Sequence, residues 1–95
     1  MTDVVGLDGF DWDEGNTAKC QKHGVTQAEI EAAFLSEPAT SEDSAHSIGE
    51  ARYFAVGRHA LGRAILIVYT WRTRDGRRLV RPISARYIGR RRGAP

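Results

Sequence analysis

Arginine is the residue type in this sequence whose spacing best suits a chemical role. Four arginines stand at or near the ends of expected strands: Arg58, Arg72, Arg81 and Arg86. Strand ends can converge on one face of a twisted sheet, and the guanidinium fork makes paired contacts with phosphate oxygens. The spacing therefore predicts a phosphate-binding site built by arginines from several strands.

A second candidate is the pair Lys22 and His23, which is followed by Gly24. A histidine titrates near neutrality and can carry a proton, and the adjacent lysine supplies a fixed positive charge. The alternative is a C-terminal helix cap, because cations there satisfy free carbonyls and the helix dipole. The residues alone leave both interpretations open.

The remaining basic clusters, at residues 74–78 and 90–92, are typical of a solvated turn and a solvated tail. Arg81 differs, because apolar residues flank it on one face of an expected strand, so it has either a structural or a site role. Trp71 precedes Arg72 at a strand end and is a candidate for stacking on unpaired bases. The other aromatic residues fit a core or a sheet surface.

No metal or cofactor motif is present in the sequence. The motifs of a P-loop, a zinc site and a Ser/His/Asp grouping are missing. His46 and His59 fall in expected loops without ligand spacing, and Cys20 is expected to be a small core residue. We therefore expect neither a metal site nor a cofactor.

The charge of the chain is divided between its two halves. The formal net charge is +2, but residues 1–50 hold eleven acidic residues against two lysines, and residues 51–95 hold twelve arginines against Asp75. Such asymmetry points to a polyanion or an acidic partner met by the second half.

Length and composition indicate one small cytoplasmic domain. The 95 residues allow a single domain, residues 1–95, with an ordered core at about residues 8–88. The apolar share of 41% is too high for a disordered chain. No apolar run approaches the roughly 20 residues of a membrane span, and neither a signal peptide nor a disulfide pair is present.

The elements that must position these residues can be read from local signals. Residues 9–12 alternate as a short edge strand, and Asp13 caps a helix that continues through Lys22 and stops at Gly24. Thr26 and Glu29 form a capping box for a second helix, with Val25 and Ile30 as its hydrophobic staple and Pro38 at its close. This helix should pack its apolar face on a sheet.

The second half supplies that sheet. Strand-like runs cover residues 52–58, 63–72 and 78–85, joined by a loop at residues 59–62 and an Asp75-Gly76 turn. Pro82 requires an edge position or a bulge. Residues 39–49 are either a further short strand or a loop. The fold class is therefore α+β, with two N-terminal helices packed on an antiparallel sheet of three to four strands.

These segments together resemble a known family, the BrnT toxins. The resemblance covers roughly residues 9–88 and rests on Phe10-Asp11-Trp12-Asp13, Asn16, Lys19, Lys22-His23-Gly24-Val25, Ala28-Glu29-Ile30, Gly57-Arg58, Val68-Tyr69-Thr70 and Ile83-Ser84-Ala85-Arg86. It implies a RelE-like fold and a ribonuclease toxin of a type II toxin–antitoxin pair that blocks translation. It also implies a BrnA-like antitoxin of the ribbon-helix-helix type, RNA as substrate, with ribosome-bound mRNA one form of it, and an oligomeric toxin–antitoxin complex.

The resemblance also assigns site roles and shows departures. Gly57-Arg58 and the strand end at residues 70–72 fall where the family carries residues linked to toxicity. Many members have an acidic residue at the position of Trp71, and the family usually continues into a C-terminal helix where this sequence reads Gly89 to Pro95. The catalytic candidates are His23, Arg58, Thr70, Arg72 and Arg81, and the RNA-binding candidates are Lys22, Arg86 and Trp71.

The first functional hypothesis is a metal-independent endoribonuclease. RNA cleavage needs a base for the ribose 2′-OH, cations for the transition-state charge and an acid for the leaving oxygen. Arginine serves the middle task and transfers protons poorly. His23 is the expected base, with Tyr69 or Lys22 as second choices.

Two other hypotheses remain open from the sequence. One is a basic module of the same fold that binds nucleic acid or an antitoxin without catalysis, favoured by the missing carboxylate at Trp71 and the missing C-terminal helix. The other is an arginine-rich face that binds an acidic protein segment. An RNA cleavage assay in the presence of a chelator separates them from the ribonuclease.

Overall fold

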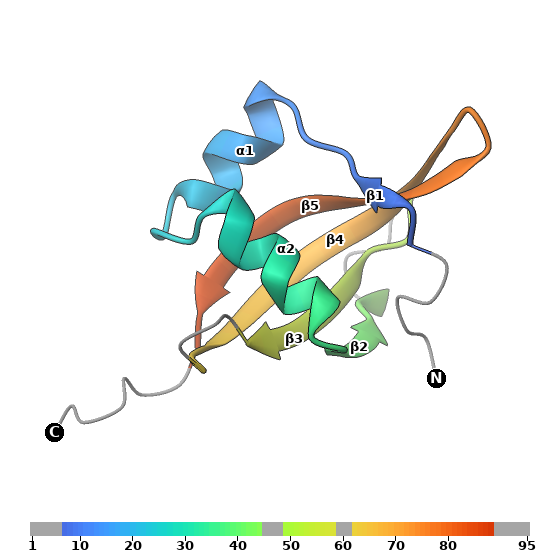
Figure 1. Cartoon of the computed structure of the whole chain (residues 1–95). Coiled ribbons are helices and arrows are strands. Elements are labelled where there is room, and N and C mark those ends of the chain that lie inside the picture. Colours follow the sequence, from blue (N-terminus) through green and yellow to red (C-terminus); the bar gives the residue numbers. More distant parts are fainter. Residues whose placement is uncertain (1–6, 45–48, 59–61, 89–95) are drawn as a thin grey trace, which may run out of the picture.

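Two helices and a five-stranded sheet make up the described residues, 7–44, 49–58 and 62–88, of this computed structural model. The two helices lie on one side of the sheet (Figure 1), and the α+β class is confirmed. None of the helices in these residues has the length and apolar character that crossing a membrane requires. The elements in chain order are β1 (Gly9–Phe10), α1 (Glu14–Gln21), α2 (Gln27–Leu35), β2 (Ala39–Glu42), β3 (Tyr53–Arg58), β4 (Ala64–Arg74) and β5 (Arg77–Tyr87).

The sheet has the strand order β1-β5-β4-β3-β2 and is mixed. β1 runs parallel to β5, with Gly9 opposite Leu79, and every other neighbouring pair is antiparallel. The prediction of three to four antiparallel strands is therefore wrong in number, and its direction is wrong only for β1. The edge strand expected at residues 9–12 is confirmed as β1, and β2 confirms the strand alternative for residues 39–49. With two and four residues, both strands are too short for periodicity to indicate their partners.

Both helix starts follow the local chemistry of the sequence. Asp13 caps α1 in a capping box with Asn16, and Thr26 caps α2 in a box with Glu29. α1 ends at Gln21, one residue before the expected end, and Gly24 adopts a φ of +87° in the turn that follows. These predictions are confirmed, because capping needs only residues that are neighbours in sequence.

The β4–β5 hairpin and the bulge in β5 are also confirmed. Asp75 and Gly76 both have positive φ, 53° and 75°, as a two-residue hairpin turn requires. The β4–β5 register shifts between Val68 and Tyr69, which pair with Ser84 and Pro82 and leave Ile83 as the extra residue. The loop expected at residues 59–62 lies outside the described residues except for Gly62.

One face of the sheet packs against the helices and forms the core. Its side chains come from alternate strand positions, as the two-residue period requires, and include Ala55, Ile65, Ile67 and Tyr69, all with no exposed surface. Cys20, Ile30 and Phe34 of the helices meet them, so Cys20 is the core residue expected.

The opposite side of the sheet is called the open face here. The intervening strand positions place their side chains on it. Four arginines of the second half have their side chains on this face. Its residues are Phe54, Val56 and Arg58 of β3, Leu66, Val68, Thr70 and Arg72 of β4, and Arg81, Ser84 and Arg86 of β5.

Asn16 fixes α1 to β5 beside this face. Its side chain is buried and donates hydrogen bonds to the carbonyls of Asp11 (2.9 Å) and Pro82 (2.8 Å), while it accepts one from the backbone of Asp13 (2.7 Å). The Pro82 carbonyl belongs to the bulged part of β5, so Asn16 sets how β5 meets α1.

Replacing Asn16 with alanine should lower the free energy of unfolding by about 2 kcal/mol, because two buried carbonyls lose their donor and a cap is lost. Urea unfolding measures this change. Gln21→Ala, at an exposed position of the same helix, should leave the midpoint nearly unchanged. Equal effects of the two substitutions would contradict the role given to Asn16.

Candidate phosphate-binding pocket

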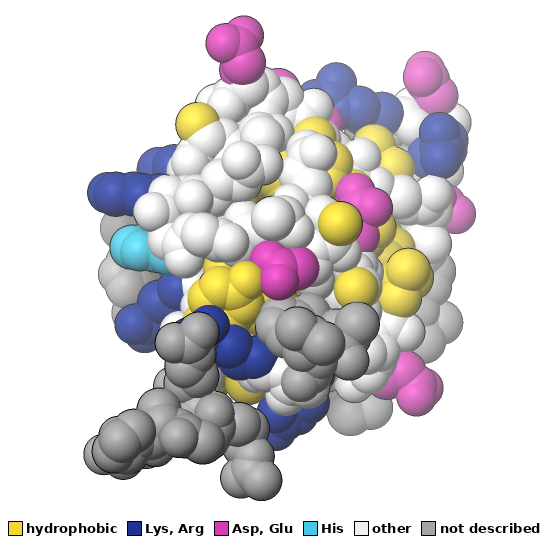
Figure 2. Space-filling model, turned by 60° about the vertical axis from the view of Figure 1, so that its left-hand side comes forward, with side chains coloured by type: hydrophobic (Ala, Val, Ile, Leu, Met, Phe, Trp, Pro, Cys, Tyr) yellow, Lys and Arg dark blue, Asp and Glu magenta, His cyan; other side chains and the backbone are white. Residues whose placement is uncertain are grey.

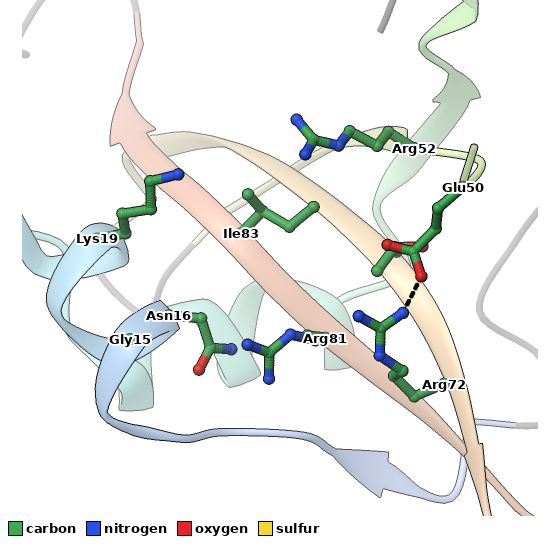
Figure 3. A pocket seen from close by; sticks show the side chains of 9 residues that line it. Gly15, Asn16, Lys19, Glu50, Arg52, Arg72, Arg81 and Ile83 are labelled. Carbon is green, nitrogen blue, oxygen red and sulfur yellow. Dashed lines mark hydrogen bonds and ion pairs between the residues drawn. The ribbon is translucent and has the colours of Figure 1, made fainter. Parts of the chain in front are cut away.

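A pocket of about 310 Å³ opens where α1, the segment before β3, β4 and β5 meet (Figure 3). Four cationic side chains and one carboxylate come together there, from segments far apart in sequence. The residues that line the pocket are Gly15, Asn16, Lys19, Glu50, Arg52, Thr70, Arg72, Arg81 and Ile83.

Thr70 places the segment that carries the pocket's carboxylate. Its side chain is 3% exposed, and its hydroxyl donates to the carbonyl of Ala51 at 2.7 Å. This bond holds the chain between Glu50 and Arg52 against β4. Glu50 then forms an ion pair with Arg72, drawn as a dashed line in Figure 3. Thr70 is therefore a positioning residue of the pocket.

Arg81 is held by two carboxylates at the start of α1. Its guanidinium lies 3.0 Å from Asp13 and 3.5 Å from Asp11, and its side chain is 20% exposed. These contacts aim the guanidinium toward the α1 side of the pocket. Arg81 therefore has both roles that the sequence left open, since it joins β5 to the α1 start and lines the pocket.

The pocket is suited to an anion of the size of phosphate. Arg72 and Arg81 stand two residues apart in register, because Thr70 is opposite Arg81 and Arg72 is opposite Leu79. Guanidinium groups at that spacing can bind different oxygens of one phosphate group. Lys19 of α1 adds an ammonium group from the other side (Figure 3).

The pKa of Asp13 reflects the hydrogen bond and the cation that its carboxyl contacts. The pKa of its carboxyl is lowered from 3.8, first by the hydrogen bond from the Asn16 backbone and further by Arg81. Because the pKa of this carboxyl is lower in the folded chain than in the unfolded chain, its ionised form stabilises the fold at pH values above the unfolded-state pKa. This contribution to the free energy of unfolding is lost as the pH falls through the folded-state pKa.

The substitution Asp13→Asn should therefore reduce the unfolding midpoint at neutral pH, and the difference from wild type should shrink as the pH drops below about 4. Asparagine still caps the helix, so the substitution isolates the charge. Thermal unfolding between neutral and acidic pH measures it. Glu14→Gln, also in the first turn, is the control; a pH-independent difference for Asp13→Asn would contradict the assignment.

His23 and Arg86 lie outside this pocket and share a smaller hollow of about 70 Å³ with Leu66, Val68, Ser84 and Ala85. His23 and Lys22 are exposed in the turn between α1 and α2. Figure 2 shows Lys and Arg side chains above and below the only histidine of the described residues. Lys22, His23 and Arg86 therefore do not line the pocket of Arg72 and Arg81.

Arg58 and Trp71 are also separate from the pocket. Arg58 is opposite Ala64, eight positions before Arg72 on β4, which is roughly 26 Å at the rise of an antiparallel strand. Its guanidinium donates to the carbonyl of Gly62 at 2.6 Å. Trp71 points to the helix side, where the guanidinium of Arg78 stacks 3.7 Å from its ring. The expected convergence of Arg58 with Arg72 and Arg81 therefore does not occur.

Tyr69 lies on the helix face and is fully buried. Burial raises the pKa of its hydroxyl to about 12. The same cause raises the pKa of the Cys20 thiol to about 11. Neither group faces the pocket, so neither is placed to exchange a proton with a ligand there.

Sequence reasoning missed three charged residues that line the pocket: Lys19, Glu50 and Arg52. Lys19 stands out only as part of the family pattern. Glu50 and Arg52 precede an expected strand, and their position on the open face depends on the Thr70 bond to Ala51. The alternation of acidic and basic residues at 50 and 52 was the one local signal.

The described residues contain no group of three His, Cys, Asp or Glu side chains close enough to hold a metal ion. His46 and His59 lie outside the described residues, as does the arginine run at 90–92.

The fold and the pocket together describe a small α+β protein with a pocket lined mainly by cationic side chains. A family model described as the ribonuclease toxin BrnT of type II toxin–antitoxin systems matches residues 12–91. The chain therefore belongs to the BrnT family of ribonuclease toxins. A comparison with curated proteins gave no match. Family membership implies an RNA substrate and an antitoxin partner.

Proposed function

We propose that this chain is a metal-independent endoribonuclease that cleaves RNA in the pocket between α1 and β5, and so inhibits translation in the cytoplasm. The observation that carries the proposal is that Arg72, Arg81 and Lys19 line one pocket together with the carboxylate of Glu50. A phosphate of RNA is the ligand these cations would select, and the carboxylate supplies the proton acceptor that arginine lacks.

The reaction assigns one task to each group. Glu50 takes the proton of the ribose 2′-OH, and the freed oxygen attacks the adjacent phosphorus. Arg72 and Arg81 stabilise the negative charge that develops on the phosphate oxygens. The bond from phosphorus to the 5′-oxygen breaks, and Lys19 donates the proton that this oxygen takes up. The products are a 2′,3′-cyclic phosphate and a 5′-hydroxyl.

The Glu50–Arg72 ion pair fits this scheme. RNA phosphate competes with Glu50 for the guanidinium of Arg72, so substrate binding releases the carboxylate to act as a base. Arg86 and Lys22 lie along the neighbouring surface, where they contact flanking phosphates by charge. His23, in the same hollow as Arg86, joins those contacts rather than the cleavage step.

RNA cleavage by the purified full chain tests the proposal, with excess chelator present throughout. We expect cleavage with cyclic-phosphate ends, and a loss of about 10²-fold or more in rate for Glu50→Gln with RNA binding retained. Glu42→Gln, an exposed carboxylate of β2, should match wild type. A wild-type cleavage rate for Glu50→Gln would show that Glu50 is not the base.

A second candidate function is RNA or antitoxin binding without cleavage. It is favoured by the observation that Arg72 and Arg81 are already paired with the protein's own carboxylates. The same assay separates the two functions, because RNA binding without any product at low and high salt supports this second candidate alone.

A further inference from the structure

The open face carries an apolar patch, which consists of Phe54, Val56, Leu66 and Val68. The β3–β4 register places Phe54 opposite Val68 and Val56 opposite Leu66, so the four side chains are contiguous. Val56 is 37% exposed, and the other three are half-buried. Both helices pack on the other side of the sheet, and within the described residues no helix covers this patch.

The central strand β4 is apolar on both of its faces. Ile65 and Ile67 are buried beneath the helices, and Leu66 and Val68 point the opposite way. Strands with two apolar faces normally lie in sheets that are covered on both sides. Within residues 7–44, 49–58 and 62–88, the helices cover only one of these two faces.

Two exposed arginines flank the patch. Arg58 lies two positions beyond Val56 on β3, and Arg86 is directly opposite Leu66 on β5. Neither of them has a carboxylate partner within the described residues, unlike Arg72 and Arg81 of the pocket. His23 borders the same margin as Arg86. An apolar centre whose marginal arginines have no carboxylate partner within the described residues selects a segment with apolar and acidic side chains.

We propose that the open face is the docking surface for an acidic amphipathic helix of a partner protein, which covers the apolar patch and pairs its carboxylates with Arg58 and Arg86. The identification of this partner as the antitoxin rests on the proposed function. The face from Arg58 to Arg72 runs for roughly 26 Å, the length of a helix of about 17 residues.

The chemistry of the patch favours a protein helix over nucleic-acid bases or a second copy of this chain as its ligand. Nucleic-acid bases bind by stacking on aromatic rings, and three of the four patch residues are aliphatic. A second copy bound symmetrically by this face would bring arginines against arginines. A helix along the strands reaches Arg72, so its docking also obstructs the entrance of the pocket and excludes RNA.

The test uses the full chain and two synthetic peptides of about 18 residues, enough for a helix of this length. One peptide carries leucines at helical spacing flanked by glutamates. Its twin is identical except that lysine replaces every glutamate. Fluorescence polarisation should show binding of the glutamate peptide and at least tenfold weaker binding of the twin. Val56→Lys and Arg86→Glu should each weaken binding of the glutamate peptide about tenfold. Arg86→Glu should also strengthen binding of the lysine peptide.

Arg77→Glu, at the far β4–β5 turn, is the matched charge control and should bind like wild type. Urea midpoints confirm that each variant is folded. The proposal is overturned if the glutamate peptide fails to bind, if both peptides bind equally, or if the patch variants bind it normally. It is also overturned if wild type is a dimer that Val56→Lys converts to a monomer, because the face is then a self-interface.

Competition with RNA distinguishes this proposal from the proposed function. Peptide binding by a chain that cleaves no RNA rejects the ribonuclease and keeps the docking surface. Cleavage that continues unchanged with the peptide bound at saturation rejects obstruction of the pocket and leaves the ribonuclease intact.

Discussion

RNA cleavage by the Arg72→Ala and Arg81→Ala variants should each be slower than cleavage by wild type by about 10²- to 10³-fold, the cost of losing one preorganised donor to a transition-state oxyanion. Both guanidinium groups line the same pocket and are held by carboxylates before any ligand arrives. The loss should fall on the rate of the bound complex more than on RNA affinity. Single-turnover cleavage with saturating protein measures that rate.

The double variant should lose less than the product of the two single losses, because both arginines act on one phosphate group. Arg77→Ala, outside the pocket, is the matched control and should cleave RNA at the wild-type rate. Arg81 also joins β5 to α1, so circular dichroism must show that its variant is folded. A folded Arg72→Ala variant with the wild-type rate would place the reaction elsewhere.

The largest expected change in stability is that of Gly57→Ala. A β-carbon at Gly57 would lie 2.6 Å from the carbonyl oxygen of Ala33 and 2.9 Å from its β-carbon. α2 crosses β3 at this point, so the helix backbone itself would have to move. Overpacking of this kind costs about 3 kcal/mol, and urea unfolding measures it.

Gly15→Ala is the control of opposite sign. Gly15 is inside α1, where a β-carbon would meet only the Asp13 side chain at 3.4 Å, so alanine should stabilise the fold by about 0.5–1 kcal/mol. Stabilisation by both substitutions would show that α2 is not seated on β3 as described.

The parts of the fold that depend on one local pattern of residues could be predicted from the sequence. The helix cap at Asp13, the capping box at Thr26, the turn at Asp75 and the bulge near Pro82 are set by residues within a few positions of each other. The parallel pairing of β1 with β5 is different, because it joins residues about seventy positions apart and involves only two of them in β1.

The sequence correctly indicated arginine as the main residue type of the pocket, but it indicated only some of the residues that line it. Their positions at or near strand ends predicted that Arg72 and Arg81 converge, and they do line one pocket. Alternation along β4 places Trp71 and Arg72 on opposite faces of the sheet, which reasoning from strand ends did not consider. Glu50 could not be placed, since its position follows from a single hydroxyl that binds a backbone carbonyl.

The ion pairs between the acidic first half and the arginines of the second half have a consequence for synthesis. Arg74 and Arg81 pair with Asp11, and Arg81 also pairs with Asp13, across more than sixty residues. α1 leaves the ribosome early, whereas β5 is the last strand of the described part to emerge. Until β5 has been made and has docked, α1 therefore lacks its ion pairs with Arg81, and the pocket lacks the wall that β5 supplies.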